Sequence, residues 1–220
     1  MYIVVENNYL NFYNDKTLFF KNSYTPNKDA FFETIKLING KFYNLGYHQK
    51  RVDLTLKNLF QKKENINLEY ILQNSNYPKK GIFRTKIIFN KDGNILIDFY
   101  PYIKREIKTL AIVESNIDYK YKFLDRTSID LLKNNFKEYD EVIISNNGYI
   151  KDTSIANIAL YHKKLKEWHT PKEPILEGTT LKRYLSEKKL IKKMIHYTDL
   201  KNYSNIATLN AMVDFNILKG

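Results

Sequence analysis

Val142-Ile143-Ile144-Ser145-Asn146-Asn147-Gly148-Tyr149-Ile150 is an apolar run followed by an Asn-Gly turn and a second strand-like segment. Asparagine and glycine accept the positive φ that a two-residue hairpin turn requires, so a β-hairpin is predicted here. The pattern occurs twice more, with turns at Asn39-Gly40 and Asp92-Gly93. Three hairpins predict that sheets form a large part of the fold.

The segments between these hairpins carry apolar residues at helical spacing. They predict three helices, at residues 48–61, 127–136 and 180–190. Two further strands are predicted at residues 190–196 and 206–213. The two halves of the chain therefore each combine a sheet with helices, and no flexible linker separates them. We predict an α+β fold with an N-terminal lobe (1–115) and a C-terminal lobe (116–220) that share a cleft.

The composition is that of a globular protein. Of the 220 residues, 43% are hydrophobic and 15% are aromatic, and no apolar run is long enough to cross a membrane. The chain has no cysteine, which excludes disulfides and thiolate chemistry. We expect no signal peptide, so the sequence favours a cytoplasmic location. The four histidines lack the spacing of metal ligands, and no metal site is predicted.

The net charge of +12 comes from lysines that are scattered along the whole chain. This scatter indicates solvated faces, whereas a nucleic-acid interface gathers its basic and aromatic residues on one surface. We therefore predict no nucleic-acid partner and a small anionic substrate. A non-enzymatic binder of acidic partners remains an open alternative.

Three separate segments carry residues that suit one kind of chemistry. Lys122 lies in a segment rich in tyrosine and lysine, Asp152 follows the third hairpin, and Gly178-Thr179-Thr180 opens a predicted helix. A lysine forms a Schiff base with an aldehyde, a carboxylate pairs with a protonated ring nitrogen, and a glycine turn at a helix start binds phosphate. A pyridoxal-phosphate enzyme needs all three.

Five motifs between Phe31 and Met212 support the same reading. They are Phe32-Glu33-Thr34, His48-Gln49-Lys50-Arg51, Lys122 with Arg126, Asp152 with Asn157, and Thr170-Pro171 followed by Leu176-Glu177-Gly178-Thr179-Thr180. In this order they resemble the class IV aminotransferases, which are fold-type IV pyridoxal-phosphate enzymes. The resemblance implies a two-lobed fold with the active site in the cleft between the lobes, and a homodimer.

The resemblance also implies the cofactor contacts. Lys122 is the Schiff-base lysine, with Lys120 as a rival because residues two apart on a strand face the same side. Asp152 replaces the usual glutamate beside the pyridine nitrogen, and Leu176 packs on the ring. One departure is Leu181, where the family usually has arginine. The phosphate contacts are expected from Arg51, Ser154, Ile155, Thr179 and Thr180.

The first motif suggests the substrate. It is more similar to the motif of aminodeoxychorismate lyase than to those of the D-amino-acid and branched-chain transaminases, which implies that Thr34 faces the substrate and assists proton transfer. Arg84, Lys86 and Asn210 are candidates to bind its carboxylates, and the first two share a strand face. We predict a 4-amino-4-deoxychorismate lyase that releases pyruvate and 4-aminobenzoate for folate biosynthesis. An amino-acid transaminase on the same scaffold is the alternative.

Overall fold

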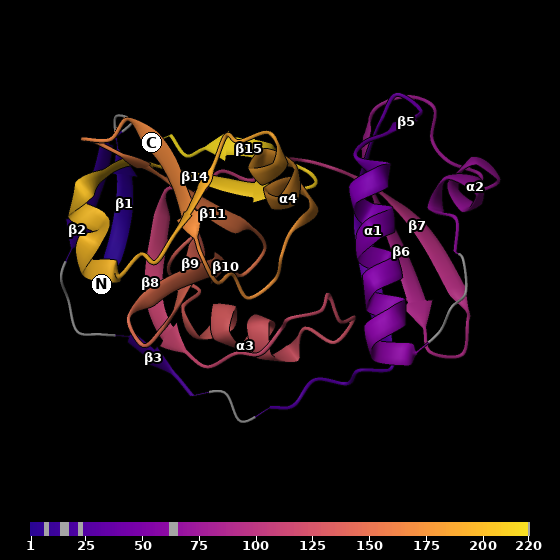
Figure 1. Cartoon of the computed structure of the whole chain (residues 1–220), viewed down its shortest axis with the longest axis horizontal. Helices are drawn as coiled ribbons and strands as arrows, with labels where there is room; N and C mark the ends of the chain where they lie inside the picture. Colours follow the sequence, from indigo (N-terminus) through magenta and orange to yellow (C-terminus); the bar gives the residue numbers. More distant parts are fainter. Residues whose placement is uncertain (7–8, 14–17, 22–23, 62–65, 220) are drawn as a thin grey trace. The chain divides into compact units, whose positions relative to one another are not determined.

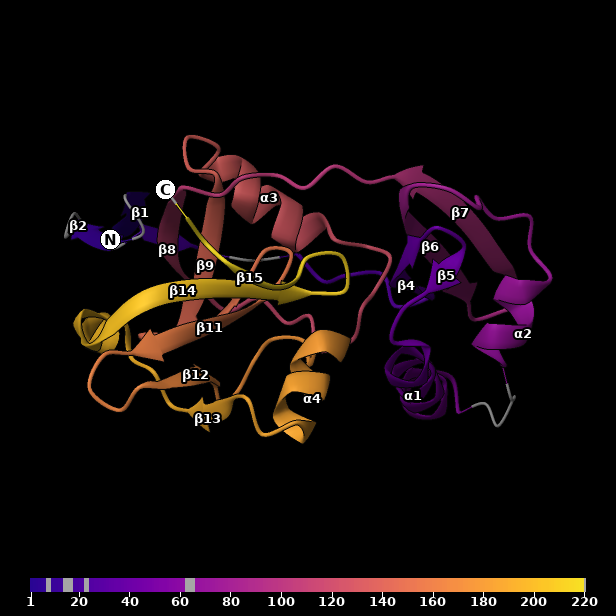
Figure 2. The ribbon, with the colours of Figure 1, turned by 90° about the horizontal axis from the view of Figure 1, so that it is seen from above.

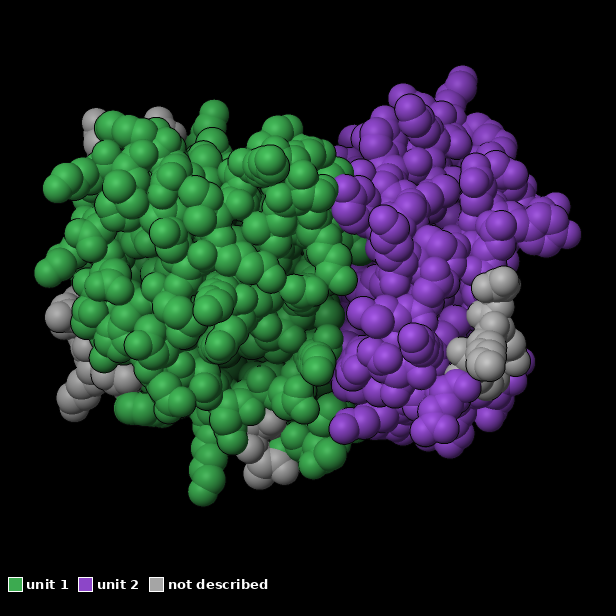
Figure 3. Space-filling model, in the orientation of Figure 1, with its two compact units in different colours: residues 1–26, 105–120, 126–220 green, residues 27–104, 121–125 purple. Residues whose placement is uncertain are grey.

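The computed structural model describes all residues except 7–8, 14–17, 22–23, 62–65 and 220 (Figure 1). The chain forms two compact units (Figure 3). Unit 1 contains residues 1–26, 105–120 and 126–220, and unit 2 contains residues 27–104 and 121–125. No helix among the described residues is long and apolar enough to cross a membrane.

The first sheet of unit 1 has six strands. Its order is β10-β9-β8-β1-β2, and β3 pairs in parallel with the last residues of β8. The strands are β1 (Tyr2–Glu6), β2 (Tyr9–Tyr13), β3 (Leu18–Phe20), β8 (Thr109–Ser115), β9 (Glu141–Asn146) and β10 (Tyr149–Thr153). Because β1 pairs with β8, residues 1–26 belong with the C-terminal half. The predicted boundary at residue 115 therefore differs from the observed division.

The second sheet of unit 1 has the order β13-β12-β11-β14-β15. Its strands are β11 (Asn157–His162), β12 (Glu167–Pro171), β13 (Ile191–Lys193), β14 (Tyr203–Asn210) and β15 (Asp214–Ile217). Buried aliphatic side chains from both sheets form one core cluster, so the two sheets pack against each other. The described residues of the unit also form the helices α3 (Thr127–Asn135) and α4 (Thr179–Ser186) and the 3₁₀ helix η2 (Tyr197–Asn202). Figure 2 shows α4 near one end of this sheet.

Unit 2 has one four-stranded antiparallel sheet, in the order β5-β4-β6-β7. Its elements are β4 (Ala30–Ile38), β5 (Lys41–Phe42), α1 (Leu45–Thr55), the π-helical turn η1 (Leu56–Phe60), α2 (Leu68–Gln73), β6 (Ile82–Asn90) and β7 (Ile95–Pro101). Side chains of α1 and α2 pack with one face of the sheet to form its core. Alternate strand residues therefore point away from these helices, on the opposite face.

The predicted hairpin turns are confirmed. Asn39-Gly40 and Asn147-Gly148 both have positive φ at each residue, between 47° and 81°, as the type I′ turn requires. Gly93 has φ 90° at the third turn, which joins β6 to β7. The α+β fold class is also confirmed.

Candidate active site

Lys122 is fixed to the edge of the sheet in unit 2. The Phe32 N–H donates to the Lys122 carbonyl (2.9 Å), and Phe31 forms an antiparallel bridge with Phe123. The Lys122 Nζ atom lies 4.4 Å from the centre of the Phe32 ring, whereas Lys120 is exposed. A half-buried amine on an aromatic face is better placed for controlled proton chemistry than a solvated one, which favours Lys122 over Lys120.

A buried ion network lies behind β4, where α1 packs on the sheet. Glu33 Oε1 accepts from Arg51 Nε (2.7 Å), and Oε2 accepts from Arg51 Nη2 and from His48 Nδ1 (both 2.6 Å). Burial alone would raise the Glu33 pKa, but the Arg51 charge and the His48 hydrogen bond lower it to about 2. Burial lowers the His48 pKa, and the charges of Arg51 and Lys122 add to this effect. The network therefore fixes the His-x-x-Arg motif to the strand.

Arg51 is the predicted phosphate ligand, and its role stays a prediction. The two bonds to Glu33 use Nε and Nη2, so this pair does not use Nη1. A guanidinium that is held on one edge can still offer its other donors to an anion. Strand alternation could have indicated this network, because Glu33 is in phase with the buried residues of β4 and a buried carboxylate needs partners.

Asp152, on β10, is a buried acid of unit 1. Its Oδ1 accepts from Asn157 Nδ2 (2.7 Å) and its Oδ2 accepts from the Leu176 N–H (2.9 Å). Burial raises the Asp152 pKa to about 7, against the opposing hydrogen bonds from Leu176 and Asn157. A carboxyl group in this state is suited to pair with a protonated ring nitrogen, because a cation would stabilise its ionised form.

The pH dependence of the free energy of unfolding tests whether the Asp152 carboxyl group is buried. Between pH 3.8 and 7 the folded Asp152 binds more protons than the unfolded one, so its contribution favours the fold at low pH and is lost as the pH rises through about 7. Without added cofactor, the free energy of unfolding of the wild type should therefore decline by up to about 4 kcal/mol as the pH rises. We expect this decline to disappear in Asp152→Asn. Urea unfolding from pH 4 to 8 measures it.

The exposed Asp98→Asn variant is the control for that experiment, since it removes a carboxylate from the surface of unit 2. Its unfolding free energy should follow that of the wild type at every pH. Parallel curves for the wild type and Asp152→Asn would contradict the predicted proton linkage.

Asn157 connects Asp152 to the start of α4. Its Nδ2 also donates to the Leu176 carbonyl (2.8 Å), and its Oδ1 accepts from the Gly178 N–H (3.1 Å). A Cβ atom at Gly178 would lie 2.2 Å from Asn157 Oδ1, so only glycine fits this position. The predicted acid and the Gly-Thr-Thr turn thus belong to one hydrogen-bonded structure.

The start of α4 has the properties of a phosphate site. Gly178 is at the N-cap position of α4 and has no side chain that could bond to the first N–H groups of the helix. The Thr180 Oγ1 atom is buried and has no hydrogen-bond partner among the described residues. Uncapped N–H groups and a helix dipole favour an anion at this position. The residues present therefore fit pyridoxal phosphate, with Asp152 for the ring nitrogen and Thr179 and Thr180 for the phosphate.

Leu181 is fully buried in an apolar cluster with residues of β11 and β14. The position that usually carries arginine in the family is therefore part of the core in this chain. Its neighbour Lys182 is paired with Glu177 (3.4 Å). Leucine suits this apolar cluster, in which a charged side chain would be costly to bury.

Ser154 is engaged with a carboxylate in this structure, and its predicted role in phosphate binding stays a prediction. Its hydroxyl donates to Glu141 Oε1 (2.5 Å), and its N–H points to the same oxygen (3.3 Å). The carboxylate works against an anion at this place, and the bond anchors the loop after β10. Arg126 Nη2 donates to the Ser154 carbonyl (3.0 Å) and ties the start of α3 to the same loop.

Ile155 and Asn210 are close together in unit 1. The Ile155 N–H donates a long bond to Thr153 Oγ1 (3.3 Å). Asn210 Oδ1 accepts from the N–H groups of Met212 and Val213, and its Nδ2 lies 3.4 Å from the Ile155 carbonyl. Asn210 thus shapes the turn between β14 and β15, and its substrate role stays a prediction.

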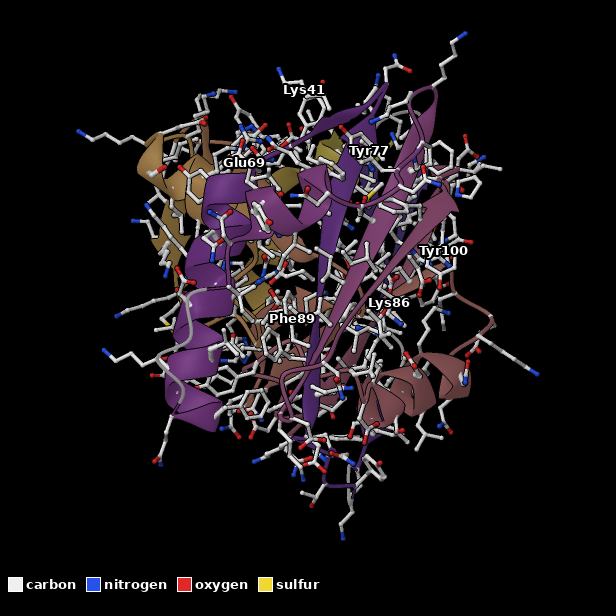
Figure 4. The ribbon with its side chains drawn as sticks, turned by 90° about the vertical axis from the view of Figure 1, so that its right-hand side faces the viewer. Lys41, Glu69, Tyr77, Lys86, Phe89 and Tyr100 are labelled. Atoms are coloured by element: carbon white, nitrogen blue, oxygen red, sulfur yellow. The ribbon has the colours of Figure 1, made fainter. Side chains whose placement is uncertain are left out.

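Thr34, Arg84 and Lys86 are the remaining predicted residues. They lie on the face of the unit 2 sheet that points away from α1 and α2, which we call the open face. Figure 4 shows Lys86 and Tyr100 on the opposite side of the strands from Phe89, which belongs to the core on the other face. Thr34 on β4 is directly opposite Lys86 on β6, and Arg84 is two residues before Lys86. The Arg84 guanidinium lies 5.0 Å from the centre of the Tyr100 ring, and Lys86 Nζ lies 5.4 Å from that of Phe32. The sequence analysis did not predict that the rings of Phe32 and Tyr100 contact these cations, although strand alternation places both rings on this face.

No group of three or more potential ligands that could hold a metal ion occurs among the described residues.

The chain is similar to known proteins in sequence and in fold. No family model matches the chain. A curated relative, an uncharacterized protein of Haemophilus influenzae, is 30% identical over 184 residues, which are 82% of this chain and 96% of that protein. A crystal structure from Haemophilus somnus, described as a candidate 4-amino-4-deoxychorismate lyase, is 31% identical with a TM-score of 0.72 and covers 84% of this chain and 97% of that chain.

A more distant structure shares the fold. A candidate amino-acid aminotransferase of Mesorhizobium loti has a TM-score of 0.72 at 18% identity, and the match covers 86% of this chain and 98% of that chain. At this identity the likeness shows the fold alone. The two structures together show that the scaffold hosts proteins described by both chemistries.

Proposed function

Because the chain belongs to the fold-type IV family of pyridoxal-phosphate enzymes, which includes class IV aminotransferases and 4-amino-4-deoxychorismate lyases, we propose that it is a 4-amino-4-deoxychorismate lyase. The observation that carries the proposal is the buried Asp152 beside the uncapped start of α4, in a chain that is 31% identical to a protein described by that activity. The products are pyruvate and 4-aminobenzoate, and we assign the reaction to folate biosynthesis.

The proposed residues divide cofactor binding and proton transfer among them. Lys122 would hold the cofactor through its amine and would carry the proton at the reacting carbon, and the Phe32 ring shields this amine from water. Asp152 would pair with the ring nitrogen and favour its protonated form, and Leu176 would pack on the ring. The residues that would hold the phosphate are Thr179, Thr180, Ser154, Ile155 and Arg51. When bound, pyridoxal phosphate supplies the aldehyde and an electron-withdrawing ring.

The substrate residues are proposed on the open face of the unit 2 sheet. Thr34 faces the substrate and assists proton transfer. Arg84 and Lys86 bind the carboxylates, since cations on one strand face are complementary to a dianion. Asn210 is the third candidate. We also propose a homodimer and a cytoplasmic location.

The test is a product assay on the purified protein with added pyridoxal phosphate and 4-amino-4-deoxychorismate. We expect pyruvate and 4-aminobenzoate to form in equal amounts, with pyruvate followed by a coupled dehydrogenase and 4-aminobenzoate by chromatography. Heat-denatured protein with the same cofactor is the control. Absence of both products would contradict the lyase proposal.

An amino-acid transaminase is the second candidate, because proteins described as aminotransferases have this fold. Incubation of the cofactor-loaded protein with single D- and L-amino acids distinguishes the two. A transaminase converts them to 2-oxo acids and leaves the cofactor in its amine form, whereas the lyase is expected to do so only slowly.

A further inference from the structure

The side chain of Asn157 lies between Asp152 and the start of α4, and both polar atoms of its amide are bonded. Nδ2 donates to Asp152 Oδ1 (2.7 Å) and to the Leu176 carbonyl (2.8 Å), and Oδ1 accepts from the Gly178 N–H (3.1 Å). Asn157 and Asp152 are both buried. An amide that uses both of its donors in this way cannot rotate without breaking several bonds.

Two backbone groups decide which way the amide faces. The Gly178 N–H can only donate, so it requires the amide oxygen, and the Leu176 carbonyl can only accept, so it requires the amide nitrogen. The second hydrogen of that nitrogen is then directed at Asp152 Oδ1. The amide is also closely enclosed, because a Cβ atom on residue 178 would lie 2.2 Å from Asn157 Oδ1. Asp152 therefore receives a donor on Oδ1 whether it is protonated or not.

The turn at residues 176–178 contacts both oxygens of Asp152. The Leu176 N–H donates directly to Oδ2 (2.9 Å), and the contact with Oδ1 is made through Asn157. Donors on both oxygens stabilise a carboxylate more than a carboxylic acid, because the charged form accepts stronger hydrogen bonds. They oppose burial, which raises the Asp152 pKa to about 7. At this value the acid changes its charge near neutral pH, so the loss of one hydrogen bond would alter its state there.

The bond from Asn157 is a neutral contact in a region that also contains charges. The titratable and charged residues on the segments that pack against β10 are Glu141 of β9, His162 of β11, Glu167 and His169 of β12, and Lys172, Glu173 and Glu177 before α4. The ammonium of Lys151, which precedes Asp152, favours the ionised acid and is paired with Glu173 (3.0 Å). Replacing Asn157 by an apolar residue leaves all of these charges in place.

We propose that Asn157 is a positioning residue of the cofactor site: its amide, oriented by residues 176 and 178, holds a donor on Asp152 Oδ1 and thereby favours the ionised acid that pairs with the ring nitrogen. This inference rests on the proposed role of Asp152 and deepens it. The same amide accepts from the N–H of Gly178, the N-cap residue of α4. One side chain thus connects the state of the acid with the position of the helix start.

The test follows the Asp152 carboxyl group in protein that contains no cofactor. Aspartate labelled with ¹³C at its side-chain carboxyl gives NMR signals that titrate with pH, and comparison with Asp152→Asn identifies the signal of Asp152. In the wild type we expect this signal to titrate near pH 7. In Asn157→Leu, which has a similar size but no donor, the midpoint should rise by about 1–2 pH units, because a hydrogen bond to the charged form is lost.

The direction of the shift separates this role from a purely structural one. If Asn157 served only to hold the turn, its loss would admit water to Asp152 and lower the midpoint towards the ordinary value of 3.8. A midpoint that falls or stays the same in Asn157→Leu would therefore overturn the proposal. The signals of the other aspartates are the internal reference and should titrate alike in both proteins.

Asn157→Asp is the second variant, and it decides the question if Asn157→Leu does not fold. It keeps the shape of the side chain and an oxygen for the Gly178 N–H, but it replaces the donor by a second carboxyl group. Two acids at this distance hold on to one proton between them, so we expect one of their two titrations above the wild-type midpoint of Asp152. Two titrations at or below that midpoint would contradict the proposal.

Thr170→Val is the matched control. It removes another buried hydrogen bond of unit 1, from the Thr170 hydroxyl to the Ile158 carbonyl (2.8 Å), and it keeps the shape of the side chain. The Asp152 midpoint should equal that of the wild type, and a rise as large as in Asn157→Leu would overturn the proposal. The titration requires neither cofactor nor product formation. It can therefore fail while the lyase assay succeeds, and it can succeed in a protein that proves to be a transaminase.

Discussion

Glu33→Gln is expected to lower the free energy of unfolding by about 3–5 kcal/mol, because it leaves the buried Arg51 guanidinium without its charge partner. His48 also loses the carboxylate to which it is bonded. Urea unfolding at pH 7 measures the change. The control is Glu69→Gln on the exposed side of α2, which should alter stability by no more than about 0.5 kcal/mol.

The same variant has a defined pH dependence. Glu33 has a pKa of about 2 in the fold against 4.5 for a free side chain, so its contribution is fully present above pH 4.5 and is lost as the pH falls towards 2. The difference between wild type and Glu33→Gln should therefore narrow over this range. A difference that is small at pH 7, or that does not change with acid, would show that the ion network does not stabilise the fold.

Lys122→Ala is expected to abolish the visible absorption band that pyridoxal phosphate gives with the wild type, and to reduce turnover by at least about 10²–10⁴. The variant loses both the amine that binds the aldehyde and the group that moves the proton. Difference spectra and borohydride treatment followed by peptide mapping measure the first effect, and the product assay measures the second.

Lys120→Ala is the matched control for that experiment, since it removes a lysine two residues away whose side chain is exposed. It should retain the band, and borohydride should still fix the cofactor on the peptide that contains Lys122. A band that survives in Lys122→Ala and disappears in Lys120→Ala would reverse the assignment.

Local features of the fold were readable from sequence. The Asn-Gly turns have the backbone that their residues favour, and the predicted helix at residues 180–190 corresponds to α4 (Thr179–Ser186). Such features depend on a few neighbouring residues. The division into units was not predicted, because it depends on the pairing of β1 with β8, which joins segments about a hundred residues apart.

The candidate site was only partly predictable for the same reason. The order of motifs identified Lys122 and Asp152, but the direction of a side chain in a turn is set by its neighbours in space. Ser154 is bonded to Glu141, which no local pattern indicates. Likewise, the contact between Lys122 and Phe32 depends on a short pairing between residue 122 and the edge of a distant strand.

The interleaved course of the chain has a consequence for its biosynthesis. Residues 27–104 form nearly all of unit 2, and they leave the ribosome before β8, the strand that pairs with both β1 and β3. At ~5–20 residues per second, the first strands of the protein wait several seconds for their partner. The middle of the polypeptide is therefore expected to fold first, while both ends of the chain complete the other unit only when translation is nearly finished.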